Sequence, residues 1–205
     1  MKSKRAASRV LKSVTIFIEE KLHLKVNTEK TNICRPVNFH LLGYNFVSTY
    51  IKGEKGKYRL RVSPKAFAKM KKRVKQITRK TRPLSFSARV YELNRFMKGW
   101  IGYFRLAFMQ EKLKALDSWI RSRLRYCIWK HWKTHSKRMR SYIRMGIPRG
   151  RAYSWSRSRL GGWAQSRSPM MRTTVTNLRL KRRGYIEFNE YYQKYAAKLN
   201  PPIKF

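Results

Sequence analysis

Two long stretches of this chain carry many lysines and arginines and no acidic residue. Lys55 to Tyr91 holds 14 basic residues, and Ser118 to Ile186 holds 19. Over all 205 residues, 51 Lys and Arg and 9 Asp and Glu give a formal charge of +42. Charge of this density destabilises a compact chain by self-repulsion, and a polyanion relieves the repulsion. The sequence therefore predicts a nucleic-acid partner.

The apolar content indicates a folded protein rather than a disordered basic tail. Hydrophobic residues make up 42% of the chain and aromatic residues 14%, whereas disordered segments are poor in both. Much of the apolar sequence recurs at helical spacing, and a short part of it alternates as in strands. We expect a mainly α fold, α+β overall: a helical bundle with a small β-hairpin near the N-terminal end.

The first 62 residues combine one helix with the hairpin. Arg5 to Lys21 has an amphipathic pattern, so a helix that packs on another surface is predicted. The segments HLLGYNFVSTY and KYRLRVS alternate, and the turn-forming KGEKG lies between them. These features predict one hairpin of two strands.

Residues 63–135 predict three antiparallel helices that share a core. Ser63 and Ser87 are expected to cap the first two, with Pro64 at the first helical position. The third helix is expected from Glu111 to His131, with Arg121, Arg125 and Lys130 pointing outward. The expected apolar seams are Phe67, Met70, Val74 and Ile77; Val90, Leu93, Met97, Trp100 and Phe104; and Leu113, Leu116, Ile120, Leu124, Cys127 and Ile128.

Residues 136–205 are expected to form a third part of the chain. Its first half, up to Ser168, is rich in Arg, Ser, Gly and aromatic residues and is interpreted as irregular backbone around one short helix. Ser168 and Pro169 then predict a single helix that Gly184 ends.

Metal-dependent phosphoryl transfer has little support in this sequence. A two-metal site needs clustered carboxylates, but Asp117 is the one aspartate and the eight glutamates are scattered. Neither a phosphate-binding glycine loop nor a nucleophile motif is present. No catalytic residue and no cofactor are predicted.

One row of residues has the spacing of metal ligands. Cys127, His131 and His135 fall at i, i+4 and i+8 and would share one helical face. A continuous helix would place the first and last roughly 12 Å apart, too far for one tetrahedral Zn²⁺. We therefore expect a buried cysteine with surface histidines, and no metal.

Cys34 and Cys127 form no disulfide pattern, which favours a reducing, cytoplasmic location. No apolar run reaches the roughly 20 residues of a membrane span, so no membrane partner is expected.

The segment LNRFMKGWIGYFRLA, Leu93 to Ala107, resembles the maturase-specific segment of group II intron-encoded reverse transcriptases. LKVNTEKTNI is similar to the last palm segments of that family, and LLGYNF to its primer-grip hairpin, with Leu42, Gly43 and Tyr44 as the matching residues. RSRLRYCIWKHWK and RLGGWAQSRSPMMRTTVTNLRLKRRGY resemble its thumb and domain X.

The resemblance implies three domains: the end of the palm at 1–62, a thumb-like bundle at 63–135, and the C-terminal part of domain X at 136–205. It also implies that structured RNA, group II intron RNA in particular, is the partner. The family's YxDD motif lies before the first helix expected here, so we expect a fragment that does not polymerise alone. Mg²⁺ would belong to the missing palm or to the ribozyme.

The expected RNA contacts are basic residues for phosphates and aromatic residues for unstacked bases. They are Lys71, Lys72, Lys75, Arg79, Lys80, Arg82, Tyr103, Arg105, Arg121, Arg125, Arg138, Arg140, Arg149, Arg151, Tyr153, Trp155, Arg157, Arg159, Trp163, Lys181, Arg182 and Arg183. A charged run more often forms a solvated helix face, but such faces usually carry acids as well. For Trp163, core packing is an equal alternative.

Three functions remain open from the sequence. The first is a maturase-type RNA-binding protein that assists the folding and splicing of an intron. The second is the thumb half of a split RNA-directed DNA polymerase, completed by a separately encoded N-terminal half. The third is a nonspecific nucleic-acid binder or a degenerate retroelement remnant.

Overall fold

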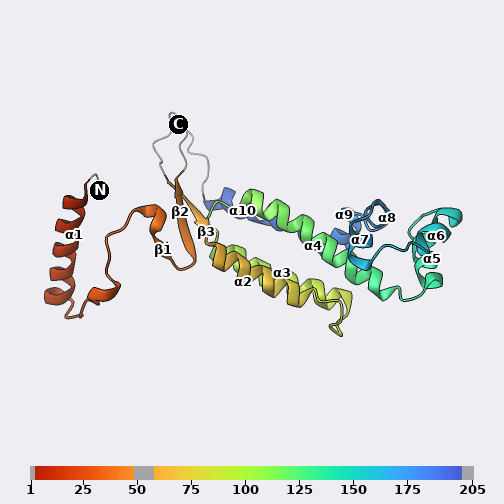
Figure 1. Ribbon diagram of the computed structural model, residues 1–205, viewed down its shortest axis with the longest axis horizontal. Coiled ribbons are helices and arrows are strands. Elements are labelled where there is room, and N and C mark those ends of the chain that lie inside the picture. Colours follow the sequence, from red (N-terminus) through yellow and green to blue (C-terminus); the bar gives the residue numbers. More distant parts are fainter. Residues whose placement is uncertain (1–2, 49–57, 200–205) are drawn as a thin grey trace, which may run out of the picture. The chain divides into compact units, whose positions relative to one another are not determined.

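A computed structural model describes residues 3–48 and 58–199. The chain divides into two compact units, Met1–Arg59 and Leu60–Phe205, and each is considered by itself. Figure 1 shows that most of the described chain is helical, with one small sheet. The predicted fold class is confirmed. The KGEKG turn lies outside the described residues.

The N-terminal unit begins with the predicted amphipathic helix. It consists of α1 (Lys4–Ile16) and one π-helical turn, η1 (Phe17–Lys21). Ser3 caps α1, since its side chain accepts a hydrogen bond from the Ala6 amide at 3.2 Å. The apolar stripe is exposed, however: Val14 is 46% and Phe17 52% accessible. Within the described residues nothing buries this stripe as the sequence led us to expect.

A tight hairpin follows two short 3₁₀ turns, η2 (Thr28–Lys30) and η3 (Pro36–Asn38). The sheet contains β1 (His40–Leu41), β2 (Tyr44–Ser48) and β3 (Tyr58–Val62), with β2 in the middle. The first predicted strand is thus wrong in one respect, because the chain reverses inside it.

Leu42 and Gly43 make this reversal, and Leu41 pairs with Tyr44 across it. Both turn residues have positive φ, 51° and 83°, as a two-residue type I′ turn requires. Leucine is not a usual turn residue, so the pattern of the sequence concealed the turn.

The C-terminal unit is built on three long helices, α2 (Pro64–Ile77), α3 (Phe86–Tyr103) and α4 (Gln110–His131). The predicted cap at Ser63 is confirmed by its bond from the Ala66 amide at 3.2 Å. The second cap is Ser85 rather than Ser87, because Ser85 accepts from the Ala88 amide at 3.1 Å. The predicted seams are buried with two exceptions: Phe67 and Trp100 are half-buried, and Ile101 lies on the α3 seam.

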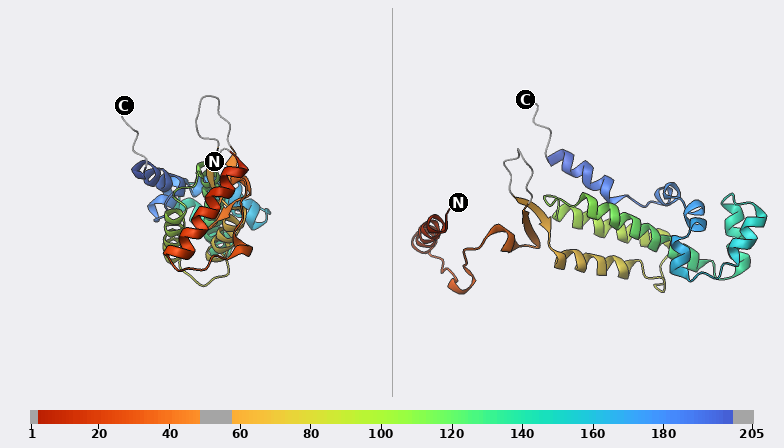
Figure 2. Two further views of the ribbon diagram at one scale, coloured as in Figure 1. Left: turned by 90° about the vertical axis from the view of Figure 1, so that its left-hand side faces the viewer. Right: turned by 45° about the horizontal axis from the view of Figure 1, so that its top comes forward.

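The last helix, α10 (Phe188–Leu199), lies against α3 and α4 (Figure 2). Asp117 of α4 anchors its beginning. The carboxylate accepts hydrogen bonds from the Tyr185 hydroxyl at 2.6 Å, the Phe188 amide at 3.1 Å and the Asn189 amide at 2.9 Å. Burial raises the pKa of Asp117 despite these bonds. The one aspartate of the chain is therefore a helix cap in the core.

Between α4 and α10 the structure contains five short helices. They are α5 (His135–Arg144), α6 (Arg149–Ser156), α7 (Gly162–Arg167), α8 (Pro169–Thr174) and α9 (Asn177–Arg182). The expectation of irregular backbone before Ser168 is wrong, because three of these helices lie there. The single helix expected after Ser168 is divided at Val175, and Thr176 caps its second half.

Tyr142 forms the centre around which α5, α6 and α8 pack. Its side chain is fully buried, and the rings of Trp132 and Trp155 meet it edge-on at 5.4 and 5.8 Å. Gly184, with φ at 88°, ends α9 as predicted. No helix in residues 3–48 and 58–199 is both long and apolar enough to cross a membrane.

Candidate nucleic-acid interface

One buried and one half-buried arginine connect the three long helices. Arg89 of α3 is 3% exposed and donates hydrogen bonds to the carbonyls of Ile77, Arg79 and Arg82 at 2.7, 2.7 and 3.1 Å. Arg123 of α4 donates to the carbonyls of Lys75 and Thr78 at 3.1 and 3.2 Å. The bonds to Ile77 and Lys75 satisfy carbonyls in the last turn of α2, which a helix end leaves without partners. The other bonds reach carbonyls of the segment that follows α2.

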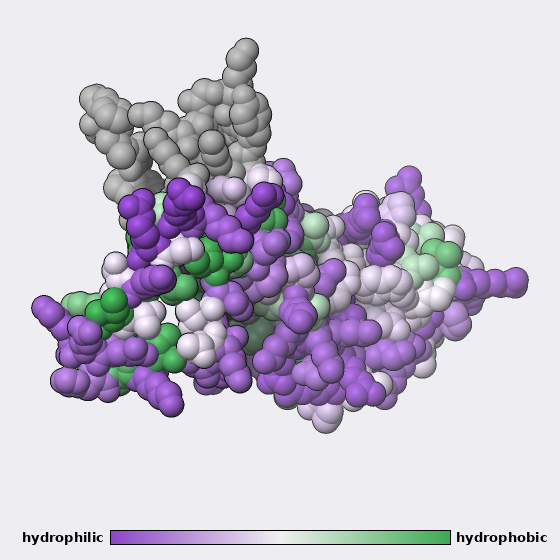
Figure 3. All heavy atoms as spheres, turned by 60° about the vertical axis from the view of Figure 1, so that its left-hand side comes forward, coloured by the Kyte–Doolittle hydropathy of each residue, from purple (hydrophilic) through white to green (hydrophobic). Residues whose placement is uncertain are grey.

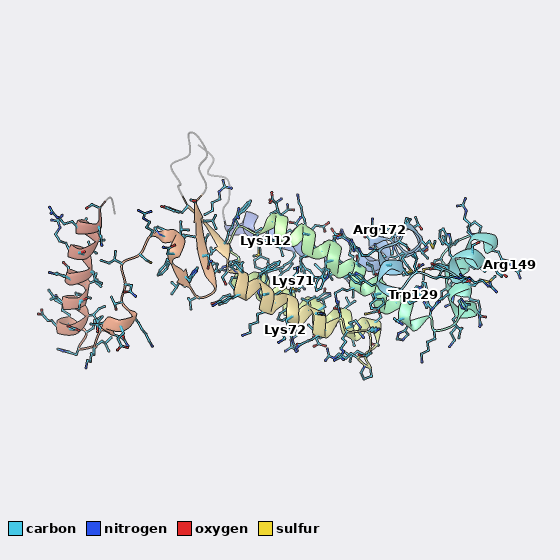
Figure 4. The ribbon with its side chains drawn as sticks, in the orientation of Figure 1. Lys71, Lys72, Lys112, Trp129, Arg149 and Arg172 are labelled. Carbon is cyan, nitrogen blue, oxygen red and sulfur yellow. The ribbon has the colours of Figure 1, made fainter. Side chains whose placement is uncertain are left out.

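On the outside of α2 and α4, cations lie over aromatic rings. The Lys71 ammonium is 5.8 Å from the Phe67 ring centre and 5.7 Å from that of Trp119. The Lys112 ammonium is 5.6 Å from Phe67, and the Arg123 guanidinium 5.2 Å from Trp119. We call these five residues the aromatic–basic face. Figure 4 labels Lys71 and Lys112, with the neighbouring Lys72 of α2.

A second cation–aromatic pair lies further along α4. The Lys80 ammonium donates to the Tyr126 hydroxyl at 3.1 Å and lies 5.5 Å from its ring centre. The Trp163 ring of α7 meets Tyr126 edge-on at 6.1 Å and remains 37% exposed. Gly162 permits this contact, because a Cβ there would lie 2.5 Å from Tyr126 and 2.9 Å from Trp129.

The short helices present further basic and aromatic side chains. The Arg157 guanidinium lies 3.7 Å from the ring centre of Tyr153, which is 51% exposed. Arg138 lies 4.1 Å from the Trp129 ring. Trp155, a candidate for base stacking, is half-buried against Tyr142. The other candidates in this region, Arg140, Arg149, Arg151 and Arg159, are exposed, and Figure 4 labels Arg149.

Some candidate cations are paired with acids that lie elsewhere in the sequence. Arg82 contacts Glu92 at 2.6 Å, and Lys181 contacts Glu190 at 2.7 Å. Arg121 lies 3.4 Å from Glu187 and is only 18% exposed. The expectation that acids are missing from these surfaces is therefore wrong at these three positions. Folding brings acidic residues from other parts of the sequence next to these basic residues, so both charges are present on the surface there.

One other expectation needs correction. Arg125, expected to point outward, is 5% exposed and donates to the Val175 carbonyl at 2.8 Å. The expectation of a buried cysteine with surface histidines is confirmed, because Cys127 is buried and His131 and His135 are exposed. The three residues do not share one helix, since α4 ends at His131 and α5 begins at His135. Cys127 is buried with its thiol 3.4 Å from the Thr78 carbonyl, and His135 bonds to the Ser156 carbonyl. Among the described residues no three His, Cys, Asp or Glu side chains form a metal cluster.

The remaining candidates are largely accessible. Tyr103 is 55% exposed and Arg105 is exposed, as predicted for the outward members of their motif. In the hairpin, Leu42 is 71% exposed, and Gly43 and Tyr44 are half-buried. Lys72, Lys75, Arg79, Arg182 and Arg183 are exposed as well. Hydrophilic residues cover much of the face in Figure 3. Binding of RNA by these residues stays a prediction.

Sequence reasoning missed Lys112, Trp119 and Arg123. Trp119 and Arg123 lie at i and i+4 of one helix, as do Phe67 and Lys71, and such pairs are neighbours on a helix surface. That spacing was available in the sequence. The approach of Lys112 to Phe67 was not, because it depends on how α4 packs on α2.

The segment that contains these features matches a known protein family. Residues 67–144 match the model of the group II intron maturase-specific domain. The match begins at Phe67 in α2 and ends with Arg144, the last residue of α5. The resemblance noted for Leu93 to Ala107 is confirmed, since that segment lies inside the matched residues. No curated protein matches the chain.

Proposed function

We propose that this chain, whose residues 67–144 form a group II intron maturase-specific domain, binds group II intron RNA and assists its folding and splicing. The observation that carries the proposal is the aromatic–basic face, which lies wholly inside the matched residues. Cations contact phosphates, and aromatic rings stack on unpaired bases. Neither task needs a protein carboxylate, and the RNA itself supplies the cleavage and ligation chemistry.

The physical role of the protein is to neutralise the phosphate charge of the RNA where two RNA helices must approach each other. Each Lys or Arg that reaches a phosphate displaces condensed counterions, so close packing of RNA becomes less costly. Lys71 and Lys112 are held over aromatic rings, which limits their conformational freedom before RNA arrives. A preorganised face loses less entropy on binding.

Charge-neutral variants test this role. We expect Lys71→Gln, Lys72→Gln and Lys112→Gln together to lower affinity for a group II intron RNA and to slow its splicing at low Mg²⁺. The slope of log affinity against log salt should become shallower by about 3, near one unit for each phosphate that is no longer neutralised. The control, Lys4→Gln, Lys12→Gln and Lys21→Gln, removes the same charge from the N-terminal unit. Equal behaviour of the two triple variants would reject the aromatic–basic face as the interface.

A second candidate function rests on the exposed stripe of α1. Val10, Val14 and Phe17 are 43%, 46% and 52% exposed, although such stripes normally pack on a partner surface. A separately encoded polypeptide carrying a polymerase half would cover the stripe and complete a reverse transcriptase. Co-purification with such a polypeptide, lost in Val14→Asp but retained in Ser13→Asp, would support this candidate. Absence of any complex and of polymerisation would remove it.

A further inference from the structure

An open pocket of about 480 Å³ lies between α4, α8 and the start of α9. Three arginines line it: Arg121 and Arg125 from α4, and Arg172 from α8. The polar side chains of Ser118, Thr176 and Asn177 complete most of the wall. The pocket is separate from the aromatic–basic face, since none of the described residues that line it belongs to that face. Figure 4 labels Arg172 at this place.

Arg125, which lines this pocket, is held by hydrogen bonds. Its side chain is buried, at 5% exposure. Its Nε donates to the Val175 carbonyl and one Nη to the Asn177 side-chain oxygen, both at 2.8 Å. Its other Nη makes no hydrogen bond within the described residues. The fork of the guanidinium is thus oriented, and one arm remains available to a ligand.

The three arginines repel one another. Burial lowers the pKa of Arg125 to about 10, and the charges of Arg121 and Arg172 act in the same direction. Glu187 offsets part of this charge, since it lies 3.4 Å from Arg121, but it does not line the pocket. Unlike the aromatic–basic face, the pocket has no aromatic ring among the described residues that line it. Its chemistry therefore calls for an anion and offers nothing for a base to stack on.

We propose that this pocket binds a single phosphate group through Arg121, Arg125 and Arg172. Guanidinium forks match phosphate oxygens in pairs, and Arg is preferred over Lys for this geometry. The hydroxyls of Ser118 and Thr176 line the same space. The phosphate could come from the RNA backbone, which rests on the proposed function, or from free phosphate, which does not.

The anion site is tested first without RNA. We expect sulfate or inorganic phosphate to raise the unfolding temperature of the full chain above that in chloride of equal ionic strength. Arg172→Gln should lose most of this extra shift, because the side chain is exposed and its removal leaves the core intact. Arg167→Gln, which removes an exposed arginine from α7 outside the pocket, should behave as the wild type. The same shift in all three proteins would overturn the proposal.

A second variant keeps the test valid if Arg172→Gln is unstable. Ser118→Asp supplies a carboxylate at the pocket, so it should raise the unfolding temperature at low salt and abolish the extra shift with sulfate. Gln193→Glu adds one negative charge on exposed α10 as the control and should retain the shift. Retention of the full shift by Ser118→Asp would also overturn the proposal.

RNA binding then identifies the source of the phosphate. A decrease in intron RNA affinity in Arg172→Gln, by about tenfold and with a salt slope shallower by about one, assigns the site to the RNA backbone. An unchanged RNA affinity together with the sulfate effect assigns it to free phosphate. If the sulfate effect is absent while wild-type RNA binding is normal, the pocket proposal fails and the proposed function stands.

Discussion

At the residue scale, a few charged side chains determine how the helices of the C-terminal unit pack. Asp117 is 3% exposed and holds the start of α10 through the Tyr185 hydroxyl and two amides. A buried charge is favourable only when such bonds satisfy it. The chain has few acidic residues, and Asp117 has a structural role.

Asp117→Ala should lower the free energy of unfolding by about 3 kcal/mol, because two buried donors and one part-buried donor are left without this acceptor. Urea unfolding of the full chain measures the change. Glu111→Ala removes an exposed acid from the first turn of the same helix, and its cost should stay under about 1 kcal/mol. A destabilisation by Asp117→Ala no larger than that of the control would contradict the anchoring role.

The pH dependence of stability follows from the raised pKa of Asp117, whose largest cause is burial. Between the unfolded pKa near 3.8 and the higher folded pKa, the native state binds more protons than the unfolded state. Stability from this group therefore falls as pH rises through that window and is constant above it. The asparagine of Asp117→Asn does not titrate.

We expect the free energy of unfolding of the wild type, minus that of Asp117→Asn, to decrease as pH rises from below 3.8 towards neutral. Urea unfolding of both proteins between about pH 3 and 7 gives this difference directly, since most other titrations cancel in it. A difference that grows with pH would mean that the folded pKa is lowered instead.

At the element scale, helix ends and one glycine determine which helices meet. Arg89 binds three carbonyls at and beyond the end of α2. Arg89→Met keeps much of the length of the side chain and removes the donors, so it should cost about 3 kcal/mol of unfolding free energy. Arg95→Met changes an exposed arginine of the same helix and should cost under about 0.5 kcal/mol. If thermal or urea unfolding shows equal destabilisation by Arg89→Met and Arg95→Met, Arg89 does not stabilise the segment that connects α2 and α3.

Gly162 sets how closely α7 approaches α4. A methyl group there would overlap the rings of Tyr126 and Trp129, so Gly162→Ala should destabilise the chain by about 1–3 kcal/mol. At Gly161 a Cβ would meet nothing within 4 Å, which makes Gly161→Ala the matched control. Urea unfolding compares the two, and near-identical stabilities would refute the close contact.

These elements show how far sequence patterns reach. The α2, α3 and α4 seams and the Ser63 cap were predictable, because apolar spacing and capping chemistry are local. For α5 to α7 the sequence predicted one short helix in irregular backbone. Met139, Tyr142 and Ile143 of α5 do recur at helical spacing, whereas the apolar residues of α6 share no face. The turn at Leu42 was missed because leucine gives no turn signal.

The sequence predicts the chemistry of the candidate site, basic and aromatic side chains, better than it predicts which individual residues are accessible. The exposed positions of Lys71, Lys72 and Tyr153 agree with the sequence pattern. The burial of Arg125 and the pairing of Arg82 with Glu92 depend on contacts between separate segments of the chain, which no local pattern contains.

At the scale of the whole molecule, net charge dominates. A formal charge of +42 on 205 residues attracts any polyanion, so tight binding to RNA would not by itself indicate a maturase. Preorganised contacts distinguish a specific partner, because they give one RNA shape a higher affinity than others at the same salt concentration. Specificity and salt dependence must therefore be measured together.

The most direct test is the affinity of the full chain for a group II intron RNA and for random duplex RNA of equal length, measured across a salt series. With about 6–10 phosphates neutralised, affinity for the intron should fall roughly 10³–10⁵ fold between about 50 and 200 mM salt, while remaining tighter than for the duplex throughout. Coincident curves for the two RNAs, or an affinity that does not change with salt, would contradict the account.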